Sequence, residues 1–249
     1  MAIGLPAWQS REAFEYVESL AGPLLAWEYL RRNPRYRAAW ALRDAAVSET
    51  AGHDWGLLLL VDPGLDARAV NPIWRPDTPT TLRVIRAAAA GDGFKLYDLG
   101  IDRRAPGAVH DGEGTYLTAS VGGNAWQIRV AEGLEPQDGI AIAIDADVYA
   151  RRRVAAAERL IGELEGKSIG SRKRASAPSR TGRFHASVLQ ALDGAAGGAS
   201  HRDIAVAMHG AKPVARRWTA DGELRASIRY FLKRGAVLVG GGYRGLIYR

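Results

Sequence analysis

Cationic side chains recur at a spacing of four residues near the C-terminal end of the sequence. Arg225, Arg229 and Lys233 would lie on one side of a helix, since residues four apart are neighbours on a helical surface. Such a row can contact the phosphates of a nucleic acid, and the planar guanidinium group can also donate two hydrogen bonds to a guanine edge. The row predicts a DNA-binding surface; the alternative interpretation is a solvated helix face.

Further cations surround this row in the C-terminal part of the sequence. Some lie in a segment rich in Lys, Arg, Ser and Gly, and others precede or follow the row within a few turns. We expect the following residues to contact DNA: Arg216, Arg217, Arg225, Arg229, Lys233, Arg234, Arg244, Lys173, Arg174, Arg183, His201 and Arg202.

No pattern typical of catalysis or metal binding accompanies these cations. The sequence contains no cysteine, which excludes disulfides, thiolate zinc sites and a cysteine nucleophile. Its five histidines are scattered, without the spacing of paired metal ligands. Gly240, Gly242 and Gly245 match the dinucleotide fingerprint in spacing, but they follow a predicted helix instead of a strand. We therefore expect no enzyme, no metal and no cofactor.

The net charge of +7 is divided unevenly along the sequence. Residues 151–249 contain 20 Lys and Arg residues against 7 Asp and Glu, a local net charge of +13, whereas residues 1–150 have a net charge of −6. Such asymmetry is typical of a protein in which one part meets a polyanion. We therefore expect double-stranded DNA to be the partner of the C-terminal part.

The sequence shows no segment typical of a signal peptide or of a membrane-spanning helix. The first 16 residues contain acidic side chains and no apolar core, so we expect no signal peptide. The longest apolar run, Leu57–Val61, is far too short to span a bilayer. We expect a cytoplasmic protein that does not engage a membrane.

Helices are expected to begin the chain. Over residues 11–46 apolar side chains recur at helical spacing, with an interruption at Gly22–Pro23 and a helix end at Asn33–Pro34. A second short helix is predicted over 35–46. These elements make residues 1–50 a predicted N-terminal helical domain.

Strand patterns replace the helical spacing over residues 51–147. Gly122, Gly123 and Asn124 separate two alternating runs, as a β-hairpin requires. We expect a small antiparallel β region, and hence an α+β protein. The predicted strands are 55–61, 94–99, 115–121, 125–130 and 140–144.

A helix over 147–166 and a basic linker over 167–180 are expected next, so residues 148–180 form a connecting segment. The linker composition lacks the large apolar groups that a packed core needs.

Residues 181–249 are expected to form a helix-turn-helix variant. Helices are predicted over 184–193, 200–210 and 221–239. Ser200 and Asp203 have the spacing of a capping box, and Gly210 can end the second helix. After Gly240–Gly242, residues 243–249 are expected to form a short wing or hairpin.

The connection over residues 210–220 is longer than the usual turn of such motifs. Either this turn carries an insertion, or Lys212–Trp218 is a short helix that meets DNA through Arg216 and Arg217. We favour the longer third helix as the element that contacts the bases.

These features resemble a known family. Residues 201–246, with ELRASIRYFLKRG and GGYRGL, are similar to the domain of unknown function shared by FseA-like activators and QseM-like antiactivators. The stretch LAWEYLRRNPRYRAAW at Leu25–Trp40 resembles the small domain that precedes it in full-length activators. The resemblance implies a regulator that activates genes for excision and conjugative transfer of integrative elements. It also implies an antiactivator protein and RNA polymerase as candidate partners.

Two hypotheses of different classes follow. The first is a DNA-binding transcriptional activator. The second is a protein-interaction module, similar to an antiactivator, that docks on another regulator. Strong salt dependence of DNA binding would favour the first.

Overall fold

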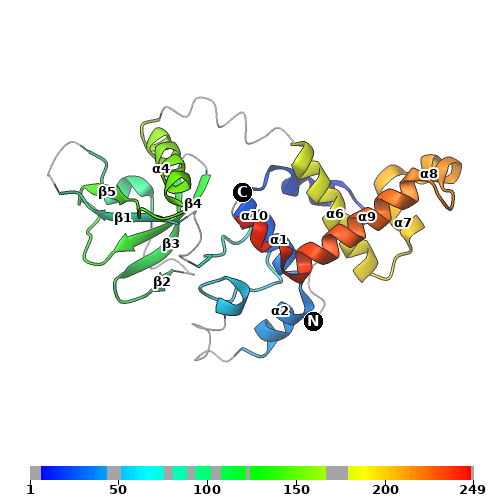
Figure 1. Ribbon diagram of the computed structural model, residues 1–249, viewed down its shortest axis with the longest axis horizontal. Coiled ribbons are helices and arrows are strands. Elements are labelled where there is room, and N and C mark those ends of the chain that lie inside the picture. The colour runs from blue at the N-terminus through cyan, green and yellow to red at the C-terminus, as the bar shows by residue number, and fades with distance from the viewer. Residues whose placement is uncertain are drawn as a thin grey trace.

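The computed structural model describes residues 7–43, 52–75, 81–88, 93–101, 108–121, 124–166 and 179–247 (Figure 1). Helices from both ends of the chain lie together in one body, and a small sheet with its own helix lies beside that body (Figure 1). The predicted α+β class is confirmed.

Three short helices open the described chain, at the breaks that the sequence predicts. Pro23 occupies the first turn of its helix, where its missing N–H costs nothing. Asn33 ends one helix and caps the next, because its side chain accepts hydrogen bonds from the N–H groups of Arg35 and Tyr36. The first segment is a 3-10 helix. These elements are η1 (Glu12–Ser19), α1 (Gly22–Leu30) and α2 (Pro34–Ala41).

The sheet is mixed instead of antiparallel, which corrects the prediction. Its strand order is β2-β3-β4-β1-β5, and β1 runs parallel to β4 while the other neighbours are antiparallel. β3 and β4 pair from Gly114 with Ala131 to Val121 with Asn124, as the predicted hairpin requires. Gly122 and Gly123 themselves lie outside the described residues. The strands are β1 (Leu82–Arg86), β2 (Val109–His110), β3 (Gly114–Val121), β4 (Asn124–Ala131) and β5 (Ile140–Ala143).

Two predicted strands are wrong, and two strands of the sheet, β1 and β2, are absent from the predicted set. The run at 55–61 follows a 3-10 turn, η2 (His53–Trp55), and Leu57 and Leu60 are buried in the helical body instead of a sheet. The run at 94–99 ends in another 3-10 turn, η3 (Leu96–Leu99). Short apolar runs do not reveal which surface buries them, so both were misassigned. In β1 the buried Leu82 and Val84 alternate with Arg83, whereas β2 has only two residues and therefore too short a pattern to predict.

Helix α4 (Ala150–Leu164) covers the sheet. Ala156, Ala157 and Leu160 are buried in one apolar cluster with Leu82 and Ile128 of the sheet. This helix confirms the one predicted over 147–166.

The C-terminal helices decide between the two alternatives for the connection over residues 210–220. Between α7 and α9 lies α8, which confirms that the long connection contains a short helix. The predicted wing is wrong, because a π-turn at Gly241 (φ 131°) bends the chain into a last short helix. The helices are α6 (Arg180–Ala196), α7 (His201–His209), α8 (Ala211–Arg217), α9 (Glu223–Val237), η4 (Leu238–Gly242) and α10 (Arg244–Ile247).

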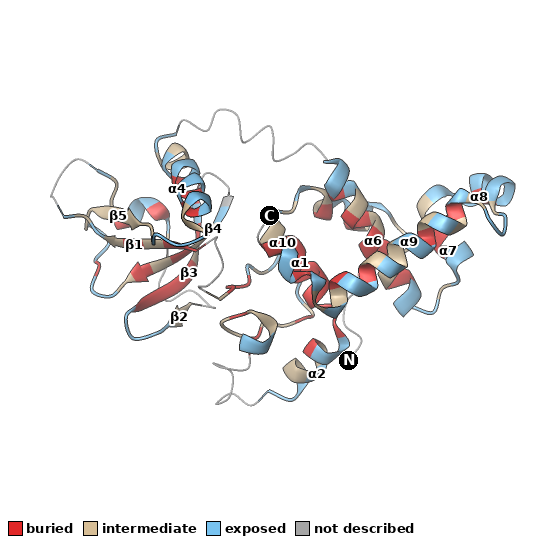
Figure 2. Ribbon diagram, in the orientation of Figure 1, coloured by how far each residue is buried: buried red, intermediate tan, exposed pale blue. Residues whose placement is uncertain are grey.

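The two ends of the chain share one hydrophobic core. Phe14 and Trp27 of the N-terminal helices are buried in the same cluster as Leu189 and Leu246 of the C-terminal helices. Figure 2 shows buried stretches in α1, α6 and α10, whose residues belong to this one cluster. A fragment limited to the C-terminal helices would expose this core to water.

Residues 52–75 also pack on the helical body. Trp27 donates its indole N–H to the carbonyl of Leu65 (3.1 Å). The sheet is tied to this segment through Gln127, whose side chain donates to the carbonyl of Trp74 (2.7 Å) and accepts from its N–H (3.0 Å).

Candidate nucleic-acid interface

The cationic helices are held by a small core of their own. Ile204 of α7, Val214 of α8 and Ile228 of α9 have no exposed surface and pack together with Ala191 of α6. These apolar positions fix the inner sides of α7, α8 and α9. The opposite sides of the three helices therefore face solvent, as the pale blue stretches in Figure 2 show.

Helix α7 begins with the predicted capping box. The Ser200 hydroxyl accepts from the N–H of Asp203 (3.2 Å), and the Asp203 carboxylate accepts from the N–H of Ser200 (3.0 Å). Hydrogen bonds from the Ser200 hydroxyl and N–H lower the pKa of Asp203. This cap holds His201 and Arg202 exposed at the start of the helix.

Gly210 joins α7 directly to α8. Its φ of 86° lies where residues with a Cβ are strained, so a single residue can reverse the chain between the two helices. In α8 only Val214 is buried, and Lys212, Arg216 and Arg217 are exposed. Lys212 is not among the residues expected to contact DNA, although it lies in the same short helix as Arg216 and Arg217.

Helix α9 presents its cations outward to different degrees. Arg229 and Lys233 are exposed, whereas Arg225 is half-buried and donates to the carbonyl of Ala220 (3.4 Å). Arg234 is also half-buried. The predicted row therefore exists, and Arg229 and Lys233 are its accessible members.

The α7–α9 end carries a positive field. Burial first, and then the nearby charges of Arg11 and Arg217, lower the pKa of His209 at the end of α7. Arg217 pairs with Glu223 across the α8–α9 connection (3.1 Å), and the two side chains are 60% and 90% exposed. A pair so exposed holds its partners weakly, so a phosphate can displace the carboxylate.

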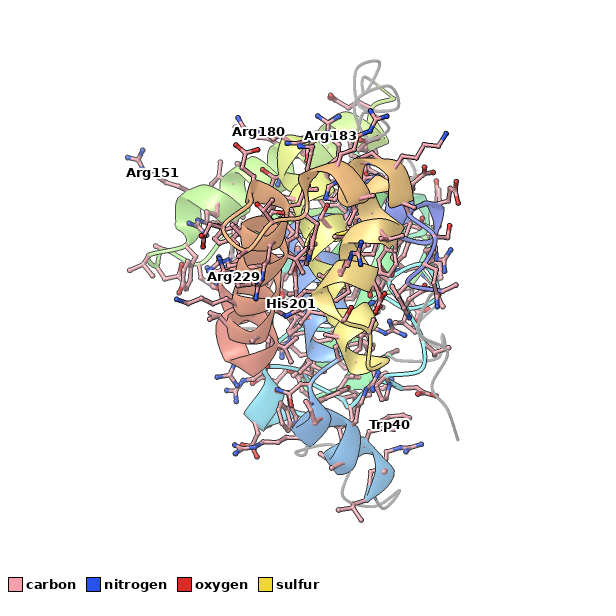
Figure 3. All side chains as sticks on the ribbon, turned by 90° about the vertical axis from the view of Figure 1, so that its right-hand side faces the viewer. Trp40, Arg151, Arg180, Arg183, His201 and Arg229 are labelled. Atoms are coloured by element: carbon pink, nitrogen blue, oxygen red, sulfur yellow. The ribbon has the colours of Figure 1, made fainter. Side chains whose placement is uncertain are left out.

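The structure gathers some predicted residues and separates others. Figure 3 looks onto the α7–α9 end and shows Arg229 on α9 and His201 at the start of α7. Arg244 lies elsewhere, on the helical body, where it donates to the carbonyl of Asp54 and lies 5.9 Å from the ring of Tyr243. Arg183 is exposed on α6. Lys173 and Arg174 lie outside the described residues.

One aromatic residue on this surface is not among the residues expected to contact DNA. Tyr230 is 57% exposed beside Arg229 on α9. Its ring lies 5.9 Å from that of Phe184 on α6. The sequence feature that could have indicated Tyr230 is its position directly after Arg229 in a helix predicted to face solvent.

A hollow on the sheet offers a different kind of site. Its volume is about 270 Å³, and its walls include Arg83, Arg129 and Arg153. All three arginines form ion pairs with carboxylates, at 2.5 to 2.7 Å. The hollow therefore presents no uncompensated positive charge.

The described part of the chain holds neither a cluster of three His, Cys, Asp or Glu residues that could bind a metal ion nor a helix long and apolar enough to cross a membrane.

Two stretches of the chain match known family models. Residues 141–248 match a model described as "T6SS, Transcription factor, DNA binding domain", and the match takes in α4 and the helices from α6 to α10. Residues 7–58 match a "Proteobacterial transcriptional regulator-like domain", which takes in η1, α1 and α2. No curated protein matches the chain. Together the two matches support a DNA-binding transcriptional regulator.

Proposed function

Starting from a DNA-binding transcriptional regulator, we propose that this protein binds double-stranded promoter DNA with the surface formed by α7, α8 and α9. The observation that carries the proposal is the set of exposed cations on helices whose inner sides form a core. Arg216, Arg229 and Lys233 are exposed, and the region matched as a DNA-binding domain contains them.

Helix α9 is the element that we assign to the major groove. It packs on both α6 and α7, which is the place of the third helix in a helix-turn-helix unit. Its 15 residues extend roughly 22 Å at 1.5 Å per residue, and the groove, about 12 Å wide, admits one helix. In this arrangement Arg229 lies at the base edges.

The two neighbouring helices then contact the backbone. Arg216 and Arg217 of α8 lie beside the start of α9, and His201 and Arg202 are presented by the capped start of α7. Phosphate contacts of this kind set the position of the protein on the duplex without reading sequence.

Salt-dependent binding tests the proposal. A duplex selected from a random library with the full chain would be titrated by fluorescence anisotropy between about 50 and 200 mM salt. If about six phosphates are engaged, log K should fall with log salt at a slope near −5. Arg216→Ala/Arg217→Ala should make the slope shallower by about 2.

The variant Arg229→Ala tests whether Arg229 contacts a base or only contributes positive charge. It should cost about 1–3 kcal/mol in binding and relax the sequence preference at one position. Arg35→Ala/Arg43→Ala removes two exposed arginines from the α2 region and serves as the control, which should bind as the wild type does. Salt-independent binding of the wild type would contradict the proposal.

We also propose that the regulated genes belong to a mobile element and that the protein activates them in the cytoplasm. The resemblance to FseA-like activators supports this role, with RNA polymerase and an antiactivator as partners. A promoter–reporter fusion from neighbouring excision or conjugation genes would test it, and an unchanged or falling signal on expression of the protein would contradict it.

A further inference from the structure

A second cationic surface lies at the start of α6. Arg180 and Arg183 are both exposed in the first turn of this helix, and Figure 3 shows their side chains close together. Ser179 caps the helix by accepting from the N–H of Gly182 (2.8 Å). Within the described ranges neither arginine forms an ion pair with a carboxylate.

Aromatic rings connect this surface to α9. Phe184 follows the two arginines, and its ring lies 5.9 Å from Tyr230 and 5.9 Å from Phe231. Tyr230 therefore packs against Phe184 on one side, while 57% of its surface remains exposed to solvent. On α9 it lies next to Arg229 and one turn before Lys233. The exposed ring of Tyr230 therefore lies between the cations of α6 and those of α9.

Each of the two helices contains one carboxylate, and both are already paired: Asp193 of α6 with Arg32, and Glu223 at the start of α9 with Arg217. No Asp or Glu occurs in residues 167–192 or 224–249. The packed 3-10 helix η1 brings Glu18 near α6, but its side chain is 9% exposed and pairs with Arg11 (3.1 Å). η1 also carries Glu12 and Glu15 at exposed positions, and in the part of the chain that the structure describes neither forms an ion pair with Arg180 or Arg183.

We propose that duplex DNA held by α9 continues across this surface. Arg180 and Arg183 hold phosphates beyond the groove contacted by α9, and Tyr230 packs on the sugar–phosphate backbone between them. The positive end of the α6 dipole adds to the attraction. The inference rests on the proposed function, because it extends the same DNA path from α9 onto α6.

Duplex length separates this contact from those of α7, α8 and α9. The full chain would be titrated with a selected duplex of about 30 base pairs and with the same duplex trimmed to the part bound by α9. On the long duplex Arg180→Ala/Arg183→Ala should weaken binding about tenfold and make the salt slope shallower by about 2, since two phosphate contacts are lost. On the trimmed duplex the variant should bind as the wild type does.

Conservative variants keep the test independent of folding. Arg180→Lys/Arg183→Lys retains both charges and should keep the wild-type slope. Tyr230→Phe should bind the long duplex normally, whereas Tyr230→Ala should bind it more weakly. The Arg35→Ala/Arg43→Ala variant again controls for loss of net charge.

Each outcome decides between the two proposals. An unchanged slope for Arg180→Ala/Arg183→Ala on the long duplex would overturn the α6 contact, and equal losses for the lysine and alanine variants would do so too. Either result leaves the proposed function standing if Arg229→Ala still weakens binding. Failure of the wild type to bind any selected duplex would instead refute the proposed function.

Discussion

The junction between the two matched regions rests on a buried ion pair whose removal has a calculable effect. The guanidinium of Arg32 donates two hydrogen bonds to Asp193, both of 2.7 Å, and a third to Glu28 (2.6 Å). The side chains of Arg32 and Asp193 are 5% and 2% exposed. Burial alone would lower the pKa of Arg32, but the charges of Asp193 and Glu28 outweigh it and raise the pKa. Asp193→Ala would leave this cation buried with one partner fewer.

The cost follows from the uncompensated charge. Removing one member of a buried pair costs about 3–5 kcal/mol. Glu28 still accepts from Arg32, so we expect the lower end of that range. For a domain of this size, about 3 kcal/mol corresponds to a fall in Tm of roughly 6–12 °C.

Urea unfolding followed by circular dichroism would measure the loss. The matched control is Arg32→Met/Asp193→Leu, which removes one charge of each sign, restores apolar volume and leaves the buried Glu28 paired with Arg31 (3.4 Å). Replacing a buried pair in this way is often neutral, so the double variant should be more stable than Asp193→Ala. A loss below about 1 kcal/mol for Asp193→Ala, or a double variant no more stable than it, would refute the reasoning.

Three further predictions concern the stability of α6, η4 and α7. Gly182→Ala should destabilise by about 1–3 kcal/mol in thermal unfolding, because its Cβ would overlap a carbonyl oxygen of η1, whereas Gly162→Ala in open space should be neutral or stabilising. Gly241→Ala, at φ 131°, should cost about 1–3 kcal/mol, and Gly240→Ala, without that constraint, should cost little; equal losses would contradict the π-turn. Hydrogen bonds from the N-cap serine lower the pKa of Asp203, so the stability that its carboxylate contributes should be present above pH 4 and be lost as pH falls through the lowered pKa; Asp203→Asn should remove this part of the acid sensitivity, as unfolding at several pH values would show.

Local patterns predicted the elements that depend on local chemistry. The breaks at Pro23 and Asn33, the cap at Ser200 and the hairpin between β3 and β4 all depend on residues within a few positions of one another. A short apolar run carries less information, so Leu57–Val61 was assigned to a strand although its neighbours are helices.

The candidate interface was predicted in composition but not in arrangement. Arg229 and Lys233 are exposed as expected, because charged side chains four apart on an amphipathic helix face away from its core. Arg244 was assigned to the same surface, yet the turn at Gly241 carries it to the helical body beside Asp54. The position of the Tyr230 ring depends on its contact with Phe184, which lies 46 positions earlier in the sequence.

By itself the sequence determined the basic C-terminal half, the helix ends and the capping box, since charge and capping are properties of residues and their near neighbours. Tertiary structure decided that the two ends of the chain form one body and which cations remain free. Arg32 and Asp193 are 161 positions apart, and no local pattern encodes their contact. Burial of such a pair depends on the whole core around it, so it is fixed when the chain folds and not by spacing along the chain.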